Sequence, residues 1–326
     1  MNSTPTRPVI VGVEGSARSA DAIALGDLLA ERLGAPLLLV HTHPSEPLAR
    51  TLDRLEHRQM VRSLFDSTFS QVQALIGEGR QRAMRVVPAS SAAAGLQRVA
   101  ERERAQLIVV GPSRRSGLGR VRPGATGERL LSGSPVPVAN APRGYAGQEA
   151  RLERLASAFD GSSESYQAFQ WAARLARPGD SQLLLASVHT PMAFGHLSAN
   201  RTLAGESVNR ALRRELSERH AAAIAAQDIC VDGVLRDGDP GTVLIDLARD
   251  RDLLVLGSRG YGPLRAVLLG SVSQAVIRRA NCPVVVVPRG ATGPESWQPI
   301  QPATGEDWSE PAPEPVERVP ALSNGR

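Results

Sequence analysis

The chain has 326 residues, 42% of them hydrophobic, which suits about two soluble domains with a core each. All 38 basic residues are arginine, and the absence of lysine excludes a Walker-type P-loop and Schiff-base chemistry. Because arginine never deprotonates, the net charge of +5 is weak evidence for nucleic-acid binding, and three Trp, three Tyr and five Phe leave little surface for stacking bases.

Apolar runs in the first half predict strands at residues 9–13, 37–41, 86–87 and 107–110, and a less apolar last strand at 136–140. Ser16 or Ser19 can cap the helix that follows the first strand. A long polar helix is expected within residues 48–80, and another helix through Leu96 and Val99.

The second half has the same order of elements. Strands are expected up to Asp160 and at residues 183–188, 253–256 and 284–287. Helices are expected at 168–175, at 207–226 and after Asp239, where Pro240 takes the first helical position. This alternation predicts a doubly wound, Rossmann-like parallel sheet with the flavodoxin-like strand order, in which ligands bind beyond the carboxyl ends of the strands.

The two halves repeat each other at a constant offset of 146 residues. Residues 13–16 correspond to 159–162, 107–111 to 253–257, and 142–144 to 288–290. The repeat predicts two tandem α/β domains, residues 1–147 and 148–290. We expect them to form a pseudo-two-fold pair through their last strands, because an apolar edge strand is an aggregation liability when unpaired.

Residues 291–326 differ in composition, with seven prolines, six carboxylates and two arginines and almost no periodic apolar pattern. Such a segment buries too little apolar surface to offset its ordering entropy. The prediction is a disordered, Pro-rich acidic tail. An interaction or regulatory segment is the functional alternative.

The most informative motif reads Gly257-Ser258-Arg259-Gly260, nine residues, then Gly270-Ser271. It follows an apolar strand and precedes a helical pattern. Glycines in such a turn expose successive backbone N–H groups, and the helix behind them adds the positive end of its dipole. The motif therefore predicts a phosphate site, with an ordinary strand-to-helix turn as the alternative.

This spacing resembles the nucleotide loop of the universal stress protein family, and residues 159–165 and 281–287 resemble that family's first turn and last strand. The resemblance extends over roughly residues 7–290. It implies an ATP site, with Mg²⁺ as a candidate companion ion. In that site Asp160 lies beside the nucleotide and the backbone of Val188 meets the adenine. The residues that would hold the phosphates and ribose are Gly257, Gly260, Gly270, Ser271 and Ser273.

The first half departs from this pattern at four positions. The substituted positions are Glu14 for Asp160, Arg114 for Gly260, Ala125 for Ser271 and Gly127 for Ser273, whereas Gly111 and Gly124 remain. An arginine at the tight glycine position brings a long side chain into the space of the phosphates, although its charge could compensate. We expect this half to be impaired in nucleotide binding and mainly structural.

Other features of the sequence point to no further chemistry. The six histidines are scattered, and we assign no catalytic residue and no metal ligand. Cys230 and Cys282 form no disulfide framework and are interpreted as core residues. No apolar run approaches the ~18 residues of a membrane span, and the N-terminus lacks a secretory stretch. A cytoplasmic location is the resulting expectation.

Together these observations predict an ATP-binding, nucleotide-responsive stress regulator that acts through a protein partner. A slow ATPase or nucleotidyl enzyme on the same scaffold is one alternative, and a scaffold without bound nucleotide is another. A nucleic-acid binder would need a clustered arginine face. A homodimer is an alternative to pairing only within the chain.

Overall fold

The computed structural model describes residues 7–44, 54–76, 83–179, 181–191, 199–258 and 269–289. The predicted tail, residues 291–326, lies outside these ranges. In the first half the elements are β1 (Val9–Gly12), α1 (Ala17–Arg32), β2 (Leu37–Pro44), α2 (Arg54–Ile76), β3 (Ala83–Ala89), α3 (Ala92–Arg102), β4 (Leu107–Val110), α4 (Ala125–Leu131) and β5 (Val138–Asn140). In the second half they are β6 (Arg154–Phe159), α5 (Ser163–Ala176), β7 (Gln182–His189), α6 (Ala199–Ala225), β8 (Val231–Asp237), α7 (Pro240–Leu247), β9 (Leu253–Gly257), α8 (Ser271–Arg279) and β10 (Val284–Val287).

The strands form one continuous sheet in the order β3-β2-β1-β4-β5-β10-β9-β6-β7-β8. Neighbouring strands are parallel except β5 and β10, which meet antiparallel at the centre with Val285 opposite Ala139. The predicted parallel sheets and the pairing of the two last strands are confirmed. The flavodoxin-like order was wrong, because each half has the Rossmann order 3-2-1-4-5 and not 2-1-3-4-5.

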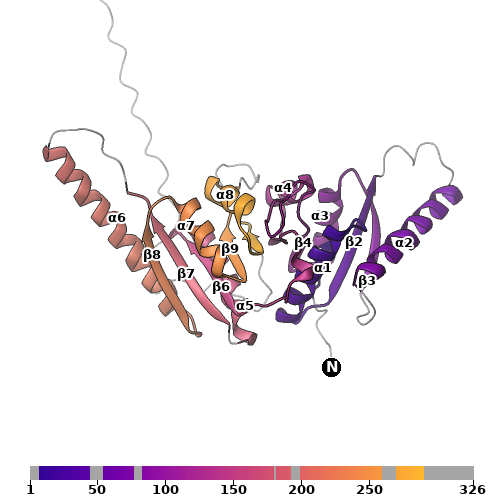
Figure 1. Ribbon diagram of the computed structural model, residues 1–326, viewed down its shortest axis with the longest axis horizontal. Coiled ribbons are helices and arrows are strands. Elements are labelled where there is room, and N and C mark those ends of the chain that lie inside the picture. The colour runs from indigo at the N-terminus through magenta and orange to yellow at the C-terminus, as the bar shows by residue number, and fades with distance from the viewer. Residues whose placement is uncertain are drawn as a thin grey trace, which may run out of the picture.

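Helices cover both faces of this sheet. Because successive strand residues face opposite sides, Val285 and Val287 pack into the core under α1 and α5, and Val284 and Val286 pack into the core under α3, α4, α7 and α8. Each core contains residues from both halves. Figure 1 shows α2 and α6 at the outer ends of the molecule and α4 and α8 near its centre.

Side chains at the helix starts explain several boundaries. Asp239 accepts a hydrogen bond from the Thr242 N–H at 2.8 Å, with Pro240 in the first helical position as predicted. Ser162 caps α5 by accepting from the Ser165 N–H at 3.2 Å. Ser16 stands at the N-cap of α1 but makes no side-chain cap bond.

Strand β8 has no counterpart among the predicted elements. Its sequence contains Asp232, Gly233 and Asp237, residue types that are depleted in strands. The strand exists because all seven of its residues pair with β7 at the edge of the sheet. That long-range pairing is not visible in a local sequence pattern. The helix before it, α6, also begins at Ala199 and not at residue 207.

Candidate functional site

A cavity of about 210 Å³ lies at the carboxyl ends of β6, β7 and β9 in the second half. The structure brings six of the seven predicted site residues to its walls: Asp160, Val188, Gly257, Gly270, Ser271 and Ser273. The seventh, Gly260, lies outside the described residues. The three separate sequence segments thus converge on one place, and their role in binding stays a prediction.

Gly257 is required by packing at the end of β9. A Cβ atom on this residue would lie 2.7 Å from the Glu164 carbonyl oxygen and 3.0 Å from the Ser165 nitrogen, both in the backbone of α5. The buried Ser273 hydroxyl donates to the Gly257 carbonyl oxygen at 3.1 Å. These contacts fix the starts of α5 and α8 against the strand and so shape the cavity.

The N-terminus of α8 opens into the cavity. Gly270 is its N-cap residue and has no side chain to cap the helix. The first backbone N–H groups of a helix have no acceptor within the helix, and they carry the positive end of its dipole. An anion in the cavity can therefore accept hydrogen bonds at Ser271 and the residues after it.

Asp160 lines the cavity and also stabilises the turn between β6 and α5. Its Oδ1 accepts hydrogen bonds from the Ser162 N–H at 3.1 Å and from the Ser162 hydroxyl at 2.5 Å. Glu164, which also lines the cavity, forms an ion pair with Arg289 at 3.1 Å. Among the described lining residues the charged groups are these two carboxylates, with no arginine.

Four further residues line this cavity that were not predicted from the sequence: Glu164, Thr190, Pro240 and Leu244. Thr190 directly follows β7, and its hydroxyl donates to the Gly238 carbonyl oxygen at 3.1 Å. The rule that ligands bind beyond the carboxyl ends of parallel strands would have marked Thr190. Glu164 lies in the first turn after the Asp160 segment, which is a comparable signal.

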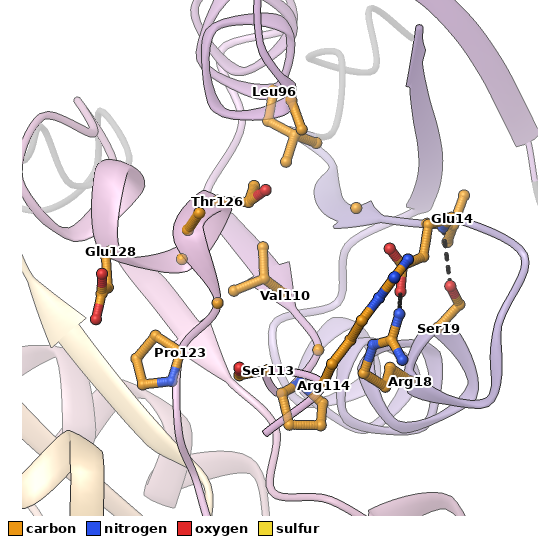
Figure 2. A pocket seen from close by; sticks show the side chains of 18 of the residues that line it. Glu14, Arg18, Ser19, Leu96, Val110, Ser113, Arg114, Pro123, Thr126 and Glu128 are labelled. Atoms are coloured by element: carbon orange, nitrogen blue, oxygen red, sulfur yellow. Dashed lines mark hydrogen bonds and ion pairs between the residues drawn. The ribbon is translucent and has the colours of Figure 1, made fainter. Parts of the chain in front are cut away.

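The first half has a cavity of about 660 Å³ at the equivalent strand ends. Its walls include all four positions that depart from the family pattern, which are Glu14, Arg114, Ala125 and Gly127. Three further arginines also line it: Arg18, Arg115 and Arg122. Figure 2 shows Arg114 pointing across the cavity toward the Glu14–Arg18 pair. The Arg114 side chain thus lies among the walls of this cavity, and the impaired nucleotide binding expected of the first half stays a prediction.

Other predicted features have mixed outcomes. Cys282 is buried, and burial raises the pKa of its thiol to about 12, but Cys230 is exposed and not a core residue.

Within the described ranges, no three His, Cys, Asp or Glu side chains gather as a metal site would require. Helices in the described part of the chain are too short or too polar to span a membrane.

The fold and its cavities define a duplicated, doubly wound α/β protein with a pocket at the strand ends of each half. The chain belongs to the universal stress protein family, whose model matches residues 5–141 and 152–288. Two matches therefore lie in one chain, which is the tandem form.

The chain is also similar to individual proteins over most or part of its length. A universal stress protein of Mycolicibacterium smegmatis is 29% identical over 296 residues, covering 86% of this chain and 96% of the relative. The crystal structure of a universal stress protein from Archaeoglobus fulgidus covers 86% of this chain and 98% of its own, with a TM-score of 0.58 and 18% identity. A family protein from Arabidopsis thaliana, solved with AMP bound, is 23% identical over 42% of this chain and 92% of its own, with a TM-score of 0.32.

Proposed function

We propose that the chain binds ATP in the cavity of its second half and acts as a nucleotide-responsive stress regulator in the cytoplasm. The observation that carries this proposal is the convergence of Asp160, Val188 and the segment around Gly270 on one cavity beyond the strand ends. Doubly wound sheets bind their ligands at this place. Membership in the universal stress protein family supports the regulatory role.

The lining residues offer a suitable group for each part of the nucleotide. The N–H groups at Ser271 to Ser273 suit phosphate oxygens. Val188 and Leu244 offer apolar contact for the base, and Asp160 can accept a hydrogen bond from a ribose hydroxyl. The cavity is smaller than the ~300 Å³ at which ligand pockets begin, so the nucleotide would occupy it in part and extend past Gly257 and Gly270.

Magnesium fits the same donor set. Mg²⁺ is usually bound by one or two carboxylates together with substrate phosphates. Asp160 and Glu164 line the cavity, and Arg289 compensates one of the two negative charges. We propose that a divalent cation accompanies the triphosphate here and offsets the repulsion between its charge and the two carboxylates.

Binding is proposed in preference to turnover. Phosphoryl transfer needs a positioned water and positive groups on the transferring phosphate. The described lining residues include no lysine, arginine or histidine. Steady release of phosphate by purified protein would favour the alternative of a slow ATPase, and protein that neither carries nor binds nucleotide would favour the alternative of a scaffold.

The test places a negative charge at the N-terminus of α8. Ser271→Glu adds a carboxylate at the helix N-terminus, where a negative charge does not destabilise the fold. The same charge repels the phosphates of a bound nucleotide. We expect at least a tenfold loss of ATP affinity at the second-half site, measured by equilibrium dialysis on the full chain. Ser271→Gln, equal in size to the glutamate variant and neutral, is the matched control.

Two outcomes would contradict the proposal. One is unchanged ATP binding in Ser271→Glu, and the other is an equal loss in Ser271→Gln, which would show that charge is not the cause. Denaturing the purified protein and identifying the released ligand by mass tests the identity of the nucleotide independently.

A further inference from the structure

We propose that the cavity of the first half is a second ligand site, which binds a phosphorylated small molecule through arginine side chains and not through the amides of a glycine loop. This site is separate from the proposed ATP site and does not depend on it. Its volume of about 660 Å³ lies within the ~300–1,000 Å³ of ligand-sized pockets.

The cavity carries uncompensated positive charge. Its two carboxylates already have partners, since Glu14 pairs with Arg18 and Glu128 with Arg278, the latter at 3.6 Å. The guanidinium groups of the remaining lining arginines have no hydrogen-bond or ion-pair partner within the described part of the chain: Arg114, Arg115 and Arg122. An anion entering the cavity therefore meets three unpaired cations.

Comparison with the described residues of the second half shows that the charge is reversed at one position of these strand ends. Arg18 stands 146 residues before Glu164, so a cation replaces a carboxylate at the equivalent wall position. Glu14, one methylene longer than Asp160, reaches Arg18 and still accepts a hydrogen bond from the Ser16 hydroxyl at 2.8 Å. The turn between β1 and α1 thus keeps its hydrogen bond, and the positive charge of Arg18 makes this wall more favourable to anions than the wall that carries Glu164.

The arginine-bearing loop, residues 112–123, is held in place at several points. The Ser113 N–H donates to the Arg122 carbonyl oxygen at 2.6 Å, and the Ser116 hydroxyl donates to the Arg120 carbonyl oxygen at 2.6 Å. The Val121 N–H donates to the Ala280 carbonyl oxygen of the second half at 2.9 Å. A fixed loop lowers the ordering cost when its side chains close on a ligand.

The walls indicate the chemical class of the ligand. A guanidinium group matches two phosphate oxygens at once, and three such groups suit a phosphate chain or two separate phosphates. Val40, Leu96 and Val110 add apolar surface, and Figure 2 shows Leu96 at the end of the cavity away from Arg114. We infer an organic phosphate whose uncharged body contacts this apolar end.

The test uses inorganic tripolyphosphate as the probe in calorimetric titrations of the full chain carrying Ser271→Glu, so that binding at the second cavity is weakened. We expect binding that weakens with salt. Each of Arg114→Gln, Arg115→Gln and Arg122→Gln should weaken it about tenfold, as loss of a charged hydrogen bond does. Arg129→Gln is the matched control, because this exposed arginine of α4 does not line the cavity.

Three results would overturn the proposal: no binding of tripolyphosphate at millimolar concentration, unchanged affinity in the triple arginine variant, or an equal loss in Arg129→Gln. Unchanged thermal midpoints are expected for all variants, because the three lining arginines are exposed and unpaired. Repeating the titration with ATP shows whether a nucleoside body adds affinity to that of the phosphates alone.

Discussion

Gly111 and Gly257 occupy equivalent positions in the repeat, and at both of them backbone packing requires glycine. A Cβ atom would lie 2.4 Å from the Arg18 carbonyl oxygen in the first case and 2.7 Å from the Glu164 carbonyl oxygen in the second. Because Gly257 has no side chain, strand β9 and helix α5 can pack closely at this position. The glycine that the sequence predicts for a phosphate cradle therefore also has a packing role, which explains why both halves keep it.

Gly257→Ala should lower the free energy of unfolding by about 1–3 kcal/mol, the usual cost of overpacking. The neighbouring atoms belong to the backbone of α5, so they cannot move aside as a flexible side chain would. Chemical denaturation measures this change. Gly147→Ala is the control, because nothing lies within 4 Å of its added Cβ; its stability should stay within about 0.5 kcal/mol. Equal effects in the two variants would contradict the packing argument.

At the scale of elements, α6 is anchored to the sheet by a buried polar contact. His220 Nδ1 lies 2.7 Å from the Ser187 hydroxyl of β7, and the imidazole meets Phe159 edge-on at a ring-centroid distance of 6.3 Å. Burial lowers the pKa of His220 below its ordinary value of 6.5. The folded state therefore favours the neutral imidazole.

This contact makes stability depend on pH in a defined direction. Below pH 6.5 the unfolded chain takes up a proton at His220 more readily than the folded chain, so acidification favours unfolding. The stabilising contribution is complete above the unfolded pKa and is lost as the pH falls toward the lowered folded pKa. Denaturation at several pH values should show a smaller decline in His220→Gln. Parallel curves for the two proteins would exclude His220 as a source of the dependence.

The elements also show what the sequence can predict. Strands β4 and β10 have the predicted bounds, because short apolar runs between turn residues are distinctive. Strand β8 and the order of the strands depend on pairing between distant segments, which no local pattern contains. The candidate site shows the same limit. The rule that ligands bind beyond strand ends was enough to predict six residues that line the second-half cavity. The direction of the Arg114 side chain in the first half could not be predicted from its position in the sequence.

At the scale of the whole molecule, the two halves form one structure. The antiparallel contact of β5 with β10 covers only three residue pairs, but both cores continue across it. Arg32 of α1 donates to the Leu152 carbonyl oxygen and to the Ser181 hydroxyl, each at 3.1 Å. Arg120 donates to the Arg279 carbonyl oxygen at 2.6 Å.

Separating the halves should therefore expose apolar surface that the intact chain buries. We expect an isolated second half, residues 148–290, to self-associate through the fully buried Val284–Val287 strand, since an unpaired apolar edge recruits another strand. Analytical ultracentrifugation over a range of concentrations measures this. Adding the first half, residues 1–147, should replace self-association by a one-to-one complex, because the natural partner strand β5 also restores both shared cores. A second half that stays monomeric at high concentration and unfolds with the stability of the intact chain would show that the halves are independent.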